Sequence, residues 1–372
     1  MTHVVHLFDE SAGWEQRVAV TQLLDRLSRD DFNQTLATLH PIGRSALRSL
    51  DVAIHAFPLL AGVDALVSPL VERLASRRSV DLIHAWGPRA ATVAAATGRP
   101  TVVELFDPLH ATRYIKRLRA IARPIGFAVI CTSQWARRRL IEGGLPPNLC
   151  VVVRPAVDFA LVNASRRTTL REALGVSAGD FVAITPEPAT RNGGHLQAYG
   201  AAALLRSANQ DIRLIVSGRS REQRRIARLD RSTPKPRTLV SPGYAYPFEQ
   251  LLPAADALIV PSRGDTSTTA IAWAMASNVA VIGTAVHSVA ELIANKLNGL
   301  LFKQTPGKDM APAIARLLLD RESQEKTKEV ARGQAYEVFG LRRCIEQHVK
   351  VYENVLSGVA PGEGIIDSAQ PN

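Results

Sequence analysis

The chain has 372 residues, 46% of them hydrophobic and only 5% aromatic, so it can bury a core in each of two α/β domains. Its formal net charge of +11 favours anionic substrates, acidic membrane surfaces or nucleic acid, although a basic solvated surface explains it equally well. Three scattered cysteines indicate neither a disulfide framework nor a zinc site. The lack of a signal-peptide pattern and of a long apolar run predicts a cytoplasmic chain without a membrane span.

Short apolar runs alternate with helical patterns through the first half of the chain. The predicted strands are 4–8, 80–84, 100–105, 128–131 and 151–153. The predicted helices between them are 14–27, 90–96 and 133–142. This alternation predicts a Rossmann-like domain over residues 1–157.

The composition of the chain changes after residue 157. Residues 158–178 are polar and rich in arginine, which predicts a linker. The alternation then restarts with predicted strands at 181–184, 212–217, 239–241, 257–260 and 279–282. A second Rossmann-like domain is therefore expected over 179–338, followed by a helix at 339–358 that could cross back to the first domain. The tail at 359–372, rich in Gly, Pro and Ser, is expected to be disordered.

The fold class predicted from this order is α/β, with two doubly wound parallel sheets facing a cleft. Ligands of such sheets bind beyond the carboxyl ends of the strands. The loop after the strand at 181–184 ends with Arg191, Asn192, Gly193 and Gly194, directly before a predicted helix. Two glycines there leave the first amides of the helix open to phosphate, or they form an ordinary strand-to-helix turn.

Two further loops follow strands of the second half. Gly218 allows a close backbone approach, and Arg219 could reach an anion. The third loop brings an acidic and three hydroxyl side chains to the start of a helix: Asp265, Thr266, Ser267 and Thr268. They are either helix caps, worth about 1 kcal/mol, or groups that hydrogen-bond a polar ligand.

A series of short motifs in the second half comprises Ala255 to Ser262, Asp265, Ala274 to Ser277, Val279 to Thr284, Glu291 and Asn298 to Leu301. In the first half, further motifs are Gly13 with Glu15, residues 81–85 with His84, and the run from Thr132 to Asp158. In order and spacing these motifs resemble a retaining glycosyltransferase of family 4, group 1, which has the GT-B fold. The resemblance covers residues 4–356.

The resemblance implies sugar transfer from a nucleotide-sugar to an acceptor, with no metal ion or other cofactor. It places the donor mainly on the second half, at the three loops and Glu291. Gly13, Glu15 and His84 would lie on the acceptor side. Asp265 matches the first of two donor glutamates, one methylene shorter, and is predicted to be catalytic. Trp273 stands at the second position, where it packs in the core or blocks the ribose site.

Other positions depart from the family pattern. Pro186 replaces the phosphate-binding arginine, and Arg191 or Arg219 could compensate for it. Phe106 replaces a histidine that faces the sugar, so that Asp107 and His110 are the predicted catalytic groups of the first half. His287-Ser288 stands where the family has two glycines. These departures leave open a second hypothesis, a non-catalytic binding or scaffold protein of the same fold.

The acceptor implied is a glycan, a lipid-linked molecule or a small molecule. The segment Arg113–Arg123 alternates cations with Ile115, Leu118 and Ile121, which predicts an amphipathic helix at a membrane surface or a solvated helix face. A nucleic-acid partner is not expected, because net charge alone supports it and no recognition motif is present.

Overall fold

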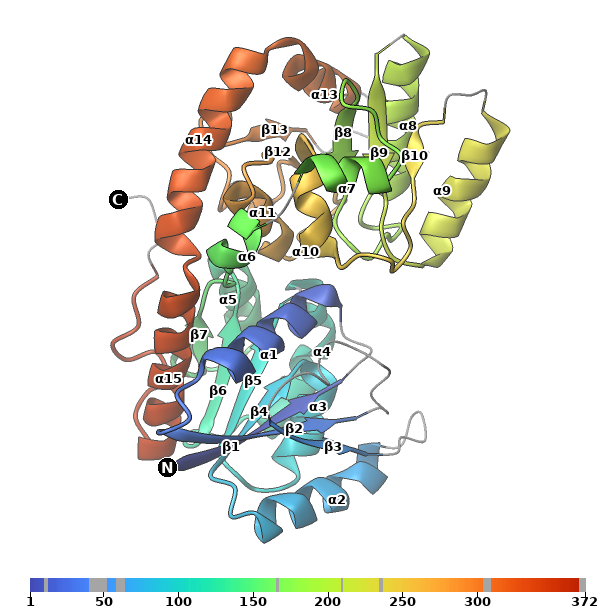
Figure 1. The fold of residues 1–372 in the computed structure, drawn as a ribbon. Helices are drawn as coiled ribbons and strands as arrows, with labels where there is room; N and C mark the ends of the chain where they lie inside the picture. The colour runs from blue at the N-terminus through green and yellow to red at the C-terminus, as the bar shows by residue number, and fades with distance from the viewer. Residues whose placement is uncertain are drawn as a thin grey trace. The chain divides into compact units, whose positions relative to one another are not determined.

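The computed structural model describes residues 1–9, 13–39, 52–57, 64–106, 108–164, 167–208, 210–233, 237–303 and 309–367; the side chains of 64–66 and 108–113 are outside this description. The chain divides into two compact units. The first comprises Met1–Ala156 and Leu341–Asn372, and the second comprises Val157–Gly340. Each unit is built on one parallel sheet with helices on both faces (Figure 1), which confirms the predicted fold class.

The N-terminal domain contains a seven-stranded sheet of order β3-β2-β1-β4-β5-β6-β7, parallel throughout. Its strands are β1 Thr2–Phe8, β2 Phe32–Thr38, β3 Ala53–Ala56, β4 Leu82–Trp86, β5 Thr101–Leu105, β6 Phe127–Cys131 and β7 Cys150–Val152. The sequence pattern does not predict β2 or β3. In β2 the residues Asn33, Gln34 and Thr35 interrupt the apolar pattern, and β3 is a half-exposed edge strand.

The helices of this domain are α1 Trp14–Arg26, α2 Asp64–Arg77, α3 Pro88–Ala95, α4 Pro108–Ile121, α5 Gln134–Glu142, the 3₁₀ helix η2 Pro147–Leu149, and α15 Leu341–Ser357. Successive strand residues face opposite sides of the sheet. Val5 and Leu7 therefore join a core under α2, α3, α4 and α5. Val4 and Phe8 join a second core under α1 and α15.

The end of the chain belongs to the N-terminal domain. Tyr352 on α15 is buried in the core beside α1. Residues 359–367 are ordered, whereas their composition predicts disorder. The Asn354 amide donates to the carbonyls of Pro361 and Glu363, and Asp367 forms an ion pair with the buried Arg154. Composition indicates a loop here but does not reveal these distant partners. Residues 368–372 lie outside the described residues.

The C-terminal domain contains a six-stranded parallel sheet of order β10-β9-β8-β11-β12-β13. Its strands are β8 Phe181–Ile184, β9 Ile212–Ile215, β10 Leu239–Val240, β11 Ala257–Val260, β12 Ala280–Thr284 and β13 Leu300–Phe302. Its helices are α6 Phe159–Ala164, α7 Arg167–Ala173, α8 His195–Ser207, α9 Arg221–Ser232, α10 Phe248–Leu251, η3 Leu252–Ala254, α11 Thr269–Ala276, α12 His287–Ala290, α13 Met310–Leu319 and α14 Arg321–Val338. Helices α8, α9 and α13 pack on one core face, and the buried α11 lies against β11, β12 and α14.

The segment 158–178 is part of the C-terminal domain and is not a separate linker. Arg171 on α7 is buried and donates to the carbonyls of Ala254, Ser177 and Asp180. Arg167 lies 2.6 Å from Asp256, which starts the turn into β11. Arginines suggest solvent exposure in the sequence, but here they bind carbonyls and a carboxylate just before the starts of β8 and β11.

Among the described residues, no helix is both long enough and apolar enough to cross a bilayer. On α4, Leu118 is buried, and Ile115 and Ile121 pack against the same core. Lys116 and Arg117 remain exposed. The apolar stripe that suggested a membrane contact therefore packs inside its own domain. The side chain of Arg113 is outside the described residues.

Candidate functional site

Three loops lie together at the carboxyl ends of the strands of the C-terminal sheet. Strands β9, β8 and β11 are neighbours and parallel, so the loops that follow them leave from the same edge. The amide of Arg263 donates to the carbonyl of Asn192 at 2.8 Å, which joins the loop after β11 to the loop after β8. The structure thus brings together the loops that carry the predicted donor-side residues.

The glycine pair before α8 is required by close packing. Gly194 adopts φ +71°, and a Cβ there would lie 1.9 Å from the carbonyl oxygen of Pro261. A Cβ on Gly193 would lie 2.4 Å from the ring of His195, and its amide donates to Thr190 Oγ1 at 2.9 Å. Helix α8 therefore starts against the loop after β11, and the positive end of its dipole lies at this loop.

His195, the first residue of α8, was missed as a site residue. The ring is buried, with Nε2 2.7 Å from the carbonyl of Pro186 and Nδ1 3.2 Å from the carbonyl of Thr190. Burial lowers the pKa of His195, although both carbonyls oppose this effect. A neutral ring that donates from Nε2 to Pro186 holds the loop after β8 in place. Its position directly after the two glycines was the one available signal.

The loop after β9 approaches the loop after β8. Gly218 adopts φ +74°, and a Cβ there would lie 2.9 Å from Glu187 Oε1. Ser217 Oγ donates to Glu187 Oε2 at 3.1 Å. Sequence reasoning did not find this half-buried carboxylate. Arg191 and Arg219 are exposed in these two loops and can bind an anion. The carboxylate of Glu187 can accept hydrogen bonds from hydroxyl groups.

The carboxylate of Asp265 accepts a hydrogen bond from the turn that starts α12. The amide of Ser288 donates to Asp265 Oδ1 at 2.8 Å, and His287 Nδ1 lies 3.8 Å from Oδ2. The amide of Thr266 donates to Ser288 Oγ at 2.9 Å. The His287-Ser288 departure and Asp265 therefore form one contact set. Glu291 is half-buried at the end of α12, and its amide donates to the carbonyl of His287.

The hydroxyl residues before α11 are largely buried. Ser267 Oγ donates to Thr269 Oγ1 at 3.1 Å and accepts from the Thr269 amide. The Thr268 hydroxyl is buried and has no partner among the described residues. Trp273 is 1% exposed, inside a helix whose eight residues are all buried. The structure therefore supports the interpretation that Trp273 packs in the core.

The N-terminal positions are more dispersed. Gly13 caps α1, and no described residue lies within 4 Å of its Cβ position; Glu15 is half-buried in the first turn. Phe106 is buried at the end of β5, with its ring stacked 6.3 Å from that of Trp86. Asp107 and the side chain of His110 lie outside the described residues, so their catalytic roles stay predictions.

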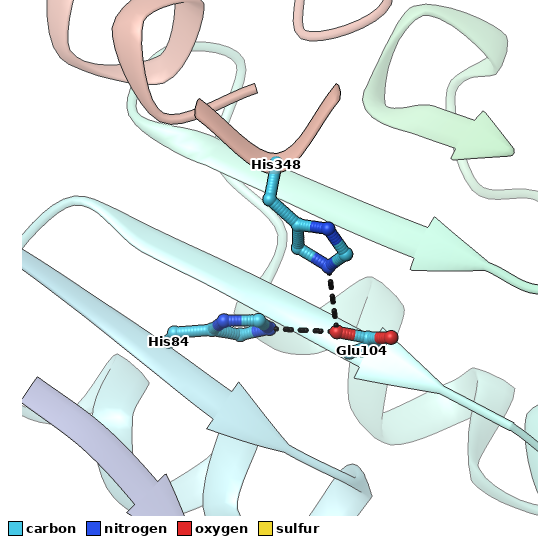
Figure 2. A group of neighbouring side chains, drawn as sticks. All are labelled: His84, Glu104 and His348. Atoms are coloured by element: carbon cyan, nitrogen blue, oxygen red, sulfur yellow. Dashed lines mark hydrogen bonds and ion pairs between the residues drawn. The ribbon is translucent and has the colours of Figure 1, made fainter. Parts of the chain in front are cut away.

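His84 lies in the core and not in an acceptor loop. It is fully buried in β4, with Nδ1 2.7 Å from Tyr352 Oη. Its Nε2 is directed at Glu104 (Figure 2) and lies 3.1 Å from Oε2. His348 Nε2 lies 3.1 Å from the same carboxylate oxygen. The two histidines therefore converge on one oxygen of Glu104. The motif at 81–85 placed His84 on the acceptor side, and it does not reveal that Tyr352 and His348 of α15 pack against this strand.

The ionisation of this group follows from its packing. Burial opposes the charge of Glu104, but His348 and His84 outweigh it and lower the pKa of Glu104 to about 2. Burial opposes the charge of His348 as well, yet Cys344 and Glu104 raise its pKa well above the usual value. Burial lowers the pKa of His84. The contact between Glu104 and His348 thus favours the charged form of both groups, whereas burial disfavours the charged form of His84.

Comparison with known families gives matches over both domains. A family model described as glycosyl transferases group 1 matches residues 166–334, and one described as glycosyltransferase family 4 matches residues 16–161. The chain belongs to the group 1, family 4 glycosyltransferases. A search of curated proteins finds no match.

Solved structures share the fold of this glycosyltransferase over nearly all of its length. Anabaena HepE in complex with UDP-glucose has a TM-score of 0.82 at 19% identity, covering 96% of this chain and 100% of that one. Sucrose-phosphate synthase from Thermosynechococcus elongatus has a TM-score of 0.79 at 17% identity, covering 96% and 100%. A glycosyltransferase from Rickettsia africae has a TM-score of 0.77 at 16% identity, covering 95% and 98%. These likenesses establish two Rossmann-like domains of the GT-B type.

Proposed function

We propose that this glycosyltransferase moves a sugar from a nucleotide-sugar to a glycan, lipid-linked or small-molecule acceptor, with retention and without a metal ion at the donor site. The observation that carries the proposal is the seating of Gly194 against Pro261, which sets the start of α8 beside the β11 loop. The similar fold of HepE, whose structure contains UDP-glucose, supports this class of donor.

The donor side acts mainly through electrostatics. The start of α8 and the exposed Arg191 and Arg219 supply positive charge at the loop edge. Negative charge grows on the diphosphate as the bond to the sugar breaks, and such groups stabilise it without reorganising. Thr266 and Thr268 can offer their hydroxyls to the same group, whereas the Ser267 hydroxyl already donates to Thr269. The buried Thr268 hydroxyl has no partner among the described residues and can donate to a ligand.

Asp265 is the proposed sugar-binding carboxylate. Its Oδ1 accepts from Ser288, while Oδ2 faces the more distant and largely exposed His287 ring. A carboxylate has lone pairs for further donors, so sugar hydroxyls can bind Oδ2 without disturbing α12. On the acceptor side we assign Asp107 and His110 to proton transfer and orientation, with Gly13 and Glu15 lining the approach.

Donor binding is the direct test. At a free nucleotide-sugar concentration of 100 times Kd, the folded state gains about 2.7 kcal/mol, which is measurable as a rise in Tm. UDP-, ADP- and GDP-sugars should be screened on the full chain, with the matching diphosphates alongside. Stabilisation by none of them would overturn the proposal.

A non-catalytic binding protein of the same fold is the second candidate, favoured by the lack of a carboxylate at position 273 and by the Ser288 contact that already occupies Asp265 Oδ1. Such a protein would show the same rise in Tm. Release of nucleoside diphosphate from the bound donor separates the two functions. Sugar transfer, or even slow hydrolysis of the donor, would exclude the non-catalytic candidate.

A further inference from the structure

Three side chains of the N-terminal domain form a ligand set that the sugar-transfer site does not use. Among the described residues, His84, Glu104 and His348 bring two imidazole nitrogens and one carboxylate oxygen within 4.8 Å of one another (Figure 2). All three side chains are buried. They come from β4, β5 and α15, so the fold assembles the group from distant parts of the chain.

The spacing fits a divalent ion bound by nitrogen and oxygen. Each Nε2 atom lies 3.1 Å from Glu104 Oε2. Ligand atoms at about 2.1 Å from a tetrahedral zinc ion lie roughly 3.4 Å apart, so small shifts suffice to admit the ion. Both ring nitrogens thus approach the same carboxylate oxygen, as neighbouring ligands of one ion do.

The outer contacts of both rings suit metal ligands. His348 Nδ1 lies 2.8 Å from the backbone carbonyl of Cys344, and His84 Nδ1 lies 2.7 Å from Tyr352 Oη. Histidines that bind metal through Nε2 use the other nitrogen in this way, which fixes the ring and its tautomer. Both Nε2 atoms therefore point toward Glu104 with their opposite sides already anchored.

A small cavity offers the fourth position. It borders Glu104, His348 and Gln22 and has a volume of about 20 Å³, enough for one water molecule. The side-chain amide nitrogen of Gln22 is buried and has no partner among the described residues, so it can donate to that water. A water molecule would then complete four-coordination with an ordered hydrogen bond.

We propose that His84, Glu104 and His348 bind a zinc ion that fastens the C-terminal helix α15 to the sheet of the N-terminal domain. Neutral imidazole and carboxylate are ligands that zinc accepts readily. The ion cross-links Glu104 and His348, which are 244 positions apart in the sequence. This structural role is independent of sugar transfer.

The experiment uses untagged full-length protein, so that no polyhistidine tag contributes zinc. After incubation with ZnCl2 and dialysis, mass spectrometry of the metal should give about one zinc per chain. Cobalt substitution should give the visible absorption of a four-coordinate ion. Treatment with dipicolinate should lower the Tm of the wild type. Wild-type protein without stoichiometric zinc would overturn the proposal.

Variants locate the ion. His348→Gln and Glu104→Gln should reduce zinc to background and make Tm insensitive to dipicolinate, because each removes one ligand. His6→Gln is the matched control, since His6 is also a fully buried histidine of this core, 5.5 Å from the His84 ring, but not a ligand. It should keep its zinc. Zinc retained in Glu104→Gln and His348→Gln, or lost equally in His6→Gln, would refute the assigned ligands.

Discussion

The α-carbon of Gly194 lies so close to Pro261 that a Cβ at this position would be 1.9 Å from the carbonyl oxygen of that proline. Gly194→Ala must therefore displace the β11 loop and strain a residue at φ +71°. We expect a loss of stability of about 1–3 kcal/mol and loss of the Tm rise with nucleotide-sugar. Urea unfolding and thermal shifts measure the two effects.

The control for this variant lies in the same helix. Gly200 is exposed on α8, and in the described part of the chain no atom lies within 4 Å of its Cβ position. Gly200→Ala should raise stability by roughly 0.5–1 kcal/mol, since alanine favours the helix, and should leave the ligand shift intact. Equal behaviour of both alanine variants would contradict the role assigned to the Gly194–Pro261 contact.

The exposed arginines are expected to affect binding and not folding. Arg191→Ala and Arg219→Ala should each weaken binding of the nucleoside diphosphate roughly tenfold, because each removes a charge-assisted contact to phosphate. Tm without ligand should stay unchanged. Arg224→Ala, which removes an exposed arginine of α9, is the control and should bind normally. Calorimetry at low and high salt measures the affinities, and unchanged affinity in both variants would place the phosphate elsewhere.

The sequence predicts the donor loops better than the N-terminal side because the signals differ in range. A glycine pair between a strand and a helix is a local pattern, and the same local packing makes Gly194 necessary. The role of His84 depends on His348, 264 residues later, and no nearby residue indicates that partner. Local periodicity predicts most strands, but it fails for β2, where buried polar residues such as Thr35 interrupt the pattern.

His195 predicts a pH dependence of stability. Its pKa is lowered in the folded state, so below about pH 6.5 the unfolded chain binds a proton that the folded chain resists. Stability should therefore fall as pH decreases from 6.5 toward the folded pKa, by at most about 1.4 kcal/mol per pH unit from this group. Urea unfolding between pH 8 and 5 measures the slope (a range chosen around the pKa of free histidine). His195→Gln should reduce this slope, to which the buried His6 and His84 also contribute, and parallel curves for variant and wild type would contradict the prediction.

The tail is held to the N-terminal domain by Asp367. Its carboxylate lies 2.7 Å from Arg154 Nη2 and 2.9 Å from Nε, and both side chains are buried. Asp367→Ala leaves a buried cation without this partner and should cost about 3 kcal/mol. The variant should also become sensitive to proteolysis after residue 357. Glu363→Ala, whose exposed side chain is not part of this pair, should behave like the wild type. A tail that stays resistant in Asp367→Ala would show that the pair is dispensable.

Asp265 separates a sugar-transferring protein from one that only binds. Asp265→Asn keeps an oxygen for the Ser288 amide, so α12 should remain in place and Tm should change little. The amide is a weaker acceptor for sugar hydroxyls than the carboxylate. Affinity for the nucleotide-sugar should fall while affinity for the bare diphosphate stays the same, and any transfer rate should fall with it. Asp265→Ala removes both contacts and should in addition lose about 1 kcal/mol of stability, as when a helix cap is removed. If Asp265→Asn weakens the diphosphate and the nucleotide-sugar equally, Asp265 does not touch the sugar, and its contact with Ser288 is its whole role.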